Sequence, residues 1–202
     1  MAKHLFLASQ SPRRRELLRQ VGVDPTVLPL RVAPGRADVD ETPYPDEAAS
    51  DYVQRLARMK AAAGLIAQVR RNLPVWPILA ADTTVTLDGH ILGKPVDAND
   101  AAAMLRRYSG RAHTVFTAVA VGSAGSLEVA LSESVVRFKT LSEAEIQAFV
   151  AARECYDKAG GYGIQGRAAL FVERLDGSYS GVMGLPLYET SELLKSVGFD
   201  IL

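Results

Sequence analysis

Three consecutive arginines, Arg13 to Arg15, follow a Ser-Pro pair where the sequence predicts the start of a helix. Ser11 is a good N-cap residue, and proline suits the first helical position. The helix dipole is positive at this end, so cationic side chains have the wrong sign for local stability. Free N–H groups at a helix N-terminus bind phosphate. A bound anion would therefore explain the arginines, because guanidinium and backbone N–H groups would converge on it.

Helical phase separates the three arginines. At about 100° per residue, Arg14 falls near the middle of the apolar face formed by the leucines that follow it. We therefore expect Arg14 to meet the phosphate, with Ser9 in the preceding turn adding hydroxyl or backbone donors. Arg13 and Arg15 flank that face. The alternative is an ordinary solvated charge run, and we expect Arg15 to be such a surface residue.

An acidic residue, Asp82, follows the apolar run 78–81, which has the length of a buried strand. Ligands in α/β sheets favour the carboxyl ends of strands, so we expect Asp82 to lie at such an end. It is a candidate general base or metal ligand, and the alternative is a turn cap beside Thr83. Hard cations such as Mg²⁺ often take only one or two carboxylates plus substrate phosphate. Glu41, in an acidic loop, is the candidate second carboxylate.

Two lysines are weaker candidates. Lys60 lies on the flank of the apolar stripe of a long predicted helix. Its spacing alone favours a lysine that snorkels at the edge of the core. Lys94 follows a predicted hairpin that begins just after the acidic residue Asp82, and its alternative is an ordinary turn lysine.

The elements that must position these residues form a mixed α/β pattern with antiparallel hairpins. Apolar runs and alternation predict strands over residues 5–8, 26–32, 75–81, 83–87, 90–92, 114–121, 127–138 and 169–174. Helical periodicity and capping signals predict helices over residues 11–21, 46–71, 97–108, 142–153 and 187–197. Ser142 and Glu145 fit a capping box. No repeat or long linker interrupts the chain, so we expect one domain over residues 1–202.

Composition narrows the class of protein. Lys+Arg and Asp+Glu both number 23, so the net charge of +0 argues against a bulk binder of nucleic acid or membrane. The single cysteine, Cys155, forms no intramolecular disulfide. The chain has no signal-peptide pattern and no apolar run near the roughly 18 residues of a membrane span. We expect a cytoplasmic protein.

Common catalytic motifs are missing from the sequence. The glycine-rich segment GGYGIQG lacks the GK[ST] ending of a phosphate-binding Walker loop. The three histidines have no metal-ligand spacing, and there is no GxSxG nucleophile elbow. The candidate functional residues are therefore the carboxylates and cations named above.

Nearly the whole chain, in order, resembles the Maf family of nucleotide pyrophosphatases, formerly called septum formation inhibitors. The matching stretches include LASQSPRRRELL, VDET, RLARMKA, ILAADTTVTLDGHILGKP and DKAGGYGIQGRAALFVERLDGSYSGVMGLPL. The resemblance implies a mixed, twisted β-sheet with flanking helices and two lobes around a deep cleft, similar to inosine triphosphate pyrophosphatases. It also implies a homodimer.

Within the family, the sequence is similar to the dTTP/UTP pyrophosphatase branch. That branch has an arginine directly after Ser-Pro, a threonine after the catalytic aspartate and a glutamine in GIQG, here Arg13, Thr83 and Gln165. The resemblance implies that these three set base preference and that Asp82 is the proton acceptor. Other positions match polar residues of the family's cleft: Ser9, Arg14, Glu41, Lys60 and Lys94.

The resemblance implies hydrolysis of a nucleoside triphosphate to the monophosphate and pyrophosphate. Asp82 would activate water, and Glu41 and Asp82 would hold Mg²⁺ or Mn²⁺. Arg14, Lys60 and Lys94 would neutralise the charge that develops on the triphosphate. Two alternatives remain open: a related pyrophosphatase that prefers 7-methyl-GTP or ITP, and a non-catalytic nucleotide-binding regulator of septum formation.

Overall fold

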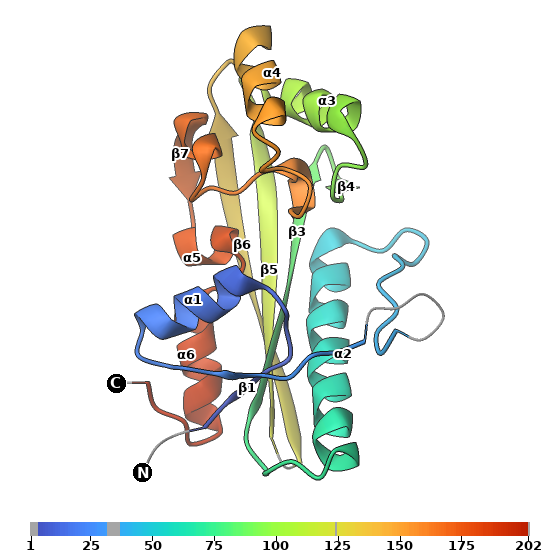
Figure 1. Cartoon of the computed structure of the whole chain (residues 1–202), viewed down its shortest axis with the longest axis vertical. Coiled ribbons are helices and arrows are strands. Elements are labelled where there is room, and N and C mark those ends of the chain that lie inside the picture. Colours follow the sequence, from blue (N-terminus) through green and yellow to red (C-terminus); the bar gives the residue numbers. More distant parts are fainter. Residues whose placement is uncertain (1–3, 32–36, 124, 202) are drawn as a thin grey trace.

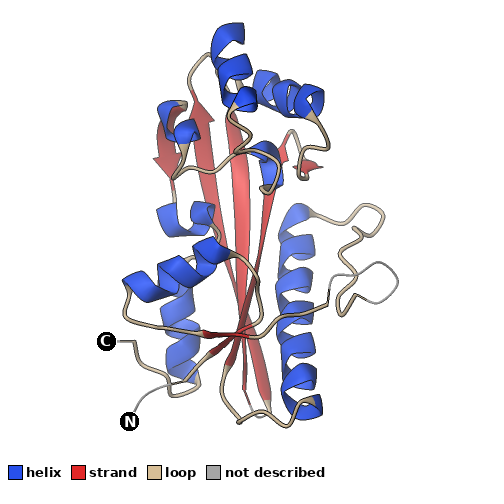
Figure 2. Cartoon of the chain, in the orientation of Figure 1, coloured by secondary structure: helices blue, strands red, loops and turns tan. Residues whose placement is uncertain are grey.

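The structure is a computed structural model that describes residues 4–31, 37–123 and 125–201. Its centre is a mixed sheet, and seven strands of the described residues form it in the order β2-β1-β3-β5-β6-β7, with β4 beside β3 (Figures 1 and 2). β1 pairs in parallel with β2 and β3, and the other pairs are antiparallel. The strands are β1 (Phe6–Leu7), β2 (Thr26–Val27), β3 (Ile78–Leu87), β4 (His90–Leu92), β5 (Ala112–Ser123), β6 (Ser126–Phe138) and β7 (Val172–Asp176).

Helices cover both faces and one end of this sheet. α2 lies along one face, α1 and α6 lie on the other, and α3 and α4 cover the end at the top of Figure 1. The elements are α1 (Pro12–Gln20), α2 (Ala49–Arg70), α3 (Ala98–Tyr108), α4 (Glu143–Ala151), α5 (Tyr179–Met183) and α6 (Leu187–Ser196), with the 3₁₀ turns η1 (Ala159–Gly161) and η2 (Arg167–Leu170). No helix in the described part of the chain is long and apolar enough to cross a lipid bilayer.

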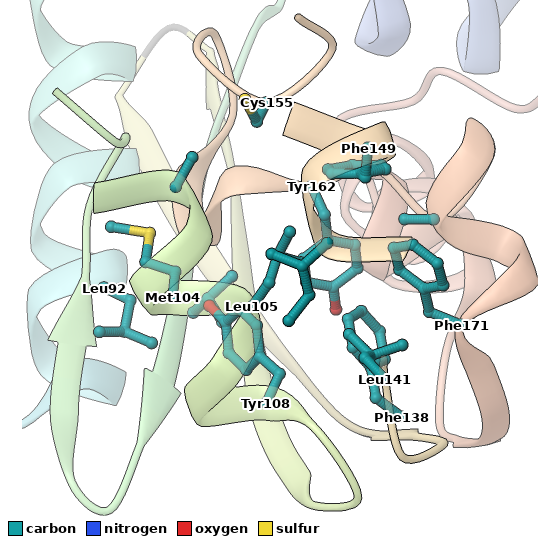
Figure 3. Close-up of a cluster of buried hydrophobic side chains, with 14 of the residues drawn as sticks. Leu92, Met104, Leu105, Tyr108, Phe138, Leu141, Phe149, Cys155, Tyr162 and Phe171 are labelled. Carbon is teal, nitrogen blue, oxygen red and sulfur yellow. The ribbon is translucent and has the colours of Figure 1, made fainter. Parts of the chain in front are cut away.

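Three hydrophobic clusters hold these elements together. Under α2, small and branched residues such as Ala57 and Ile78 pack between helix and sheet. On the opposite face, Leu18 and Leu194 join α1 and α6 to the strands. At the far end of that face, an aromatic cluster that includes Phe138 packs under α3 and α4 (Figure 3).

A row of hydroxyl side chains separates the two clusters on the α1 and α6 face. Thr83, Thr117 and Ser132 lie directly opposite one another on β3, β5 and β6. We call these three residues the hydroxyl row. On β3, Ala81 belongs to the cluster on one side of the row and Val85 to the cluster on the other. The two lobes predicted by the family resemblance are therefore confirmed as two cores on one continuous sheet.

Most predicted elements are present, with shifted ends. All five predicted helices occur, and the capping box of Ser142 and Glu145 forms at the start of α4. The predicted strand 26–32 is shorter, because β2 covers only Thr26–Val27, and Val32 lies outside the described residues. The predicted strand 169–174 begins later, because residues 167–170 form η2. The five-residue helix α5 is too short to leave a periodic signal in the sequence.

The position predicted for Asp82 is wrong. Asp82 does not end a strand, because β3 continues through it to Leu87. The backbone pairing with β5 is unbroken there, with Asp82 opposite Ala118 and Thr83 opposite Thr117. The two predicted strands 75–81 and 83–87 are therefore one strand that begins at Ile78, and Asp82 lies in its middle. The alternative of a turn cap is wrong for the same reason.

Candidate active site

A cleft with a volume of about 650 Å³ opens between the two lobes. Its walls come from the turn before α1, from α2, from the middle of β3 and from the glycine-rich segment around η1. All of the candidate site residues predicted from the sequence line this one cleft: Ser9, Arg13, Arg14, Glu41, Lys60, Asp82, Thr83, Lys94 and Gln165.

Two carboxylates share one ammonium group in the cleft. The Lys60 Nζ atom lies 2.7 Å from Asp82 Oδ1 and 2.7 Å from Glu41 Oε1. The Lys60 and Asp82 side chains are only 16% and 13% exposed, so water screens their interaction weakly. No described residue donates a hydrogen bond to Asp82 Oδ2. The interpretation of Lys60 as a lysine that merely snorkels at the core edge is therefore wrong.

The Arg14 guanidinium turns into the cleft and binds three uncharged acceptors. Nε donates to the Gly184 carbonyl at 2.8 Å, Nη1 to Ser9 Oγ at 3.1 Å and Nη2 to Thr83 Oγ1 at 3.2 Å. Burial lowers the pKa of Arg14, and the nearby Asp82 carboxylate opposes this shift. A guanidinium has five N–H donors, so one N–H remains on each of Nη1 and Nη2. The predicted turn of Arg14 toward the apolar face of the helix is confirmed.

A chain of hydroxyl groups fixes the far side of Arg14. Thr117 Oγ1 donates to the Gly181 carbonyl at 2.8 Å. Because a hydroxyl has one proton, Thr83 Oγ1, 3.1 Å from Thr117 Oγ1, must donate to Thr117 and accept from Arg14. Gly184 closes this arrangement with φ of +116°, a conformation that disfavours any residue with a Cβ atom. Two residues of the hydroxyl row therefore fix this region: Thr83 holds Arg14, and Thr117 holds α5.

The other two arginines differ from Arg14 and from each other. Arg13 Nη1 lies 3.1 Å from Asp157 Oδ2, and Lys158 pairs with the same carboxylate. Arg15 borders a second hollow beside Val27. The Arg15 side chain is not fully solvated as predicted, because its Nε is buried without a hydrogen-bond partner among the described residues. The loop before α1 and strand β2 enclose this side of the helix.

The cleft is electropositive although the whole chain has a net charge of +0. Five cationic side chains line it, against the three carboxylates of Glu41, Asp82 and Asp157. Arg14 and Lys94 have no carboxylate partner within the described ranges, whereas the other three cations do. Arg13 and Lys158 share the single carboxylate of Asp157, so part of the excess positive charge lies there, and the rest lies at Arg14 and the exposed Lys94.

The glycine-rich segment forms the wall that carries Gln165. The Gly160 N–H donates to the Gly93 carbonyl at 2.9 Å, which joins this wall to the residue before Lys94. Gly160 has φ of +71°, and a Cβ atom there would lie 2.8 Å from the Val85 side chain. Only glycine fits this approach, so the segment packs directly on β3. Gln165 itself is exposed on the cleft wall.

Three further cleft residues, Tyr52, Asp157 and Lys158, carry no functional signal in the sequence. Tyr52 fitted the apolar stripe of α2, so its pattern indicated core. In the structure its Oη donates to the Glu41 carbonyl at 2.9 Å. Burial raises the pKa of Tyr52 to about 12, and the charges of Asp82 and Glu41 add to the shift. The phenol therefore stays protonated and remains a donor at neutral pH.

Comparison with known proteins identifies the family of this chain. Residues 4–197 match the family described as Maf-like protein. This chain belongs to the Maf-like family. It is 52% identical over 198 residues to the dTTP/UTP pyrophosphatase of Nitrosomonas europaea, covering 98% of this chain and 96% of that one. It is 54% identical over 199 residues to the dTTP/UTP pyrophosphatase of Aromatoleum aromaticum, covering 98% and 97%.

Among solved structures, the Maf-like chain is similar to the Ham1 protein of Staphylococcus aureus. The TM-score is 0.46 with 14% identity, and the match covers 67% of this chain and 72% of that one. A HAM1 protein from Coxiella burnetii gives a TM-score of 0.43 with 14% identity, over 68% and 73% of the two chains.

The Maf-like cleft offers carboxylate oxygens, the type of donor that a hard cation prefers. No group of three or more His, Cys, Asp or Glu side chains in the described ranges lies in position to hold a metal ion. Glu41 and Asp82 are two carboxylates that converge on one point, the Lys60 ammonium. Mg²⁺ is commonly bound by one or two carboxylates and completes its ligand set with phosphate oxygens and water.

Proposed function

We propose that this Maf-like protein hydrolyses dTTP and UTP to the nucleoside monophosphate and pyrophosphate. The relatives from Nitrosomonas europaea and Aromatoleum aromaticum carry that activity in their names and match this chain along nearly its whole length. One observation in the structure supports the proposal most strongly. A carboxylate with a free oxygen, Asp82, faces the same cleft as Arg14, which has no carboxylate partner among the described residues.

Asp82 acts as the general base for the attacking water. Lys60 holds Oδ1, which fixes the carboxylate and leaves Oδ2 to accept the proton from water. A base that is already oriented loses little entropy when substrate binds.

Arg14 and the start of α1 bind the phosphates. Arg14 offers its two remaining N–H groups, and Lys94 adds a second cation on the opposite wall. The Ser11 side chain does not cap α1, and the backbone N–H groups of Arg13 and Arg14 bind no described residue. A phosphate bound at this point explains why arginines stand at the positive end of the helix dipole. The anion interacts favourably with both the helix N-terminus and the Arg14 guanidinium.

Arg13, Thr83 and Gln165 set the base preference in this proposal. The carboxamide of Gln165 has one acceptor and one donor group, which suits the adjacent carbonyl and N–H of thymine or uracil. Arg13 faces the cleft and pairs with Asp157, so in this proposal it reads the base while Arg14 binds the phosphates. Thr83 lines the cleft beside Arg14, from which its hydroxyl accepts a hydrogen bond.

Mg²⁺ or Mn²⁺ is the cofactor that we propose. Glu41 and Asp82 would hold it, and when bound it would offset the negative charge of the triphosphate. We also propose that the protein is cytoplasmic and forms a homodimer, and that residues 1–202 form a single domain. Its proposed role is to remove noncanonical nucleotides, and it can contribute to division arrest.

The test is pyrophosphate release from a panel of triphosphates with Mg²⁺ and with Mn²⁺. The expected result is turnover of dTTP and UTP, with the monophosphate identified chromatographically. Preference for ITP or 7-methyl-GTP would overturn the assignment of substrate. Absence of pyrophosphate release from every triphosphate would overturn the assignment as an enzyme.

A further inference from the structure

Glu41 lies on a loop and its side chain is 56% exposed, yet its carboxylate reaches the buried centre of the cleft. An exposed, long side chain on a loop keeps such a position only if the backbone on either side is held. Arg31 and Asp38 pair at 2.7 Å where the described part of this loop begins. The stronger anchor is on the other side of Glu41, at Arg55 of α2.

Arg55 forms a two-pronged contact with Glu47, the residue that leads into α2. Nε and Nη2 lie 2.6 Å from the two oxygens of the Glu47 carboxylate. The side chains are 17% and 9% exposed, so this ion pair is largely shielded from water. The guanidinium carbon also lies 4.0 Å from the centre of the Tyr44 ring, within the range of a cation–π contact. Lysine cannot reproduce this planar fork.

Two side chains of α2 hold the peptide groups at Glu41. Arg55 Nη2 donates to the Thr42 carbonyl at 3.1 Å, and Tyr52 Oη donates to the Glu41 carbonyl at 2.9 Å. Arg55 does not line the cleft, whereas Glu41 and Tyr52 do. Arg55 therefore acts on the cleft indirectly, through its contacts with the loop and with Tyr52.

We propose that Arg55, held by Glu47 and Tyr44, is a positioning residue that keeps Glu41 beside Lys60 and Asp82. The expected change in kcat/KM rests on the proposed pyrophosphatase function. The expected change in the position of Glu41 does not. The loop from residue 41 to residue 47 and the first turns of α2 then form one unit, which we call the Arg55 clasp. Because Lys60 also lies on α2, this unit fixes the position of Glu41 relative to Lys60.

A double-mutant cycle between Arg55 and Glu41 tests this role. Arg55→Ala should lower kcat/KM for dTTP by about a hundredfold, the cost expected from misplacing a catalytic group by about 1 Å. In a Glu41→Ala background, the same change should lower kcat/KM further by less than about twofold, because the group it positions is already gone. Equal losses in both backgrounds would overturn the proposal.

A control variant separates positioning from the general effect of breaking an ion pair. Arg106 of α3 makes a forked but more exposed contact with Glu143 of α4, with side chains 49% and 58% exposed, and neither residue lines the cleft. Arg106→Ala should leave kcat/KM within about twofold of the wild type, even if its melting temperature falls as much as that of Arg55→Ala. A hundredfold loss in Arg106→Ala would mean that breaking any such contact impairs the enzyme.

Amide hydrogen exchange gives a readout that needs no activity. In Arg55→Ala, the amides of the non-proline residues in 41–47 should exchange faster, while those in the second half of α2 keep their wild-type rates. Arg55→Lys and Tyr52→Phe are milder variants that should show the same pattern if the alanine variant fails to fold. Unchanged exchange in the loop would overturn the Arg55 clasp. Loss of all nucleotide turnover in the wild type would overturn the proposed function alone.

Discussion

Lys60 contacts Asp82 through one carboxylate oxygen, Oδ1, at 2.7 Å, and no described residue donates a hydrogen bond to the other oxygen. The pair links a strand to the helix that covers it, so the orientation of the Asp82 carboxylate depends on how α2 packs on β3. Glu41 joins the same ammonium from a loop. The site is therefore assembled from three segments whose relative positions are set by the fold.

Asp82→Asn should abolish turnover, because the amide keeps the shape of the side chain but cannot accept the proton from water. We expect kcat for dTTP to fall by about a thousandfold or more, the upper range for loss of a general base. Pyrophosphate release at saturating dTTP measures it. The control is Asp88→Asn, at a turn outside the cleft where φ is +54° and asparagine is tolerated. Retention of activity by Asp82→Asn would contradict the assignment.

Alanine substitutions of the three arginines should have three different effects. Arg14→Ala removes the guanidinium that we propose binds the phosphates, and it should lower kcat/KM by about a hundredfold or more. Arg13→Ala should change the ratio of activities on dTTP, UTP and purine triphosphates. Arg15→Ala should leave both quantities unchanged, because Arg15 borders the hollow outside the main cleft. Equal losses in all three variants would show that helical phase does not separate their roles.

Thr117→Val should destabilise the protein. Thr117 is 1% exposed, and its hydroxyl serves the Gly181 carbonyl and Thr83 together. Leaving these groups without a partner costs about 1–3 kcal/mol in the free energy of unfolding. Urea denaturation followed by circular dichroism measures the change. Thr86→Val is the control, since this buried β3 hydroxyl makes no hydrogen bond to the described residues, and an equal loss there would contradict the account.

Stability should fall as pH is lowered from about 6.5 to about 4, through His113. This side chain is 3% exposed among Tyr108, Phe138 and Tyr162, and burial lowers the pKa of His113 to about 4. Over this range the unfolded chain binds a proton that the folded chain does not, so acid favours unfolding. The slope from this group approaches about 1.4 kcal/mol per pH unit.

The contribution of His113 is measured by comparison with His113→Gln across a series of denaturation curves. The variant should lose this part of the pH dependence while other acid-sensitive groups, such as Glu143 and Glu145, remain. Parallel pH profiles for the wild type and the variant would contradict the prediction.

Sequence reasoning reached Arg14 through helix geometry alone, because periodicity determines which side of a helix a residue faces. It reached Glu41, Lys60 and Lys94 mainly through the family resemblance, since nothing in their spacing brings them together. It misplaced Asp82 because the alternating residues after it suggested a new strand, whereas pairing with β5 continues through it. It missed Tyr52 and Arg55, whose roles depend on contacts with a loop that the pattern of α2 does not reveal.

The hydroxyl row also has a consequence for how the sequence tolerates change. On the sheet face that α1 and α6 cover, the two hydrophobic clusters meet only through partly buried residues in the described part of the chain, such as Val182. Packing defects at Leu18 and at Phe138 should therefore add and should not compensate each other. Core side chains of one lobe can therefore be substituted independently of those in the other. A register shift in β3 or β5, by contrast, would change the packing of both lobes.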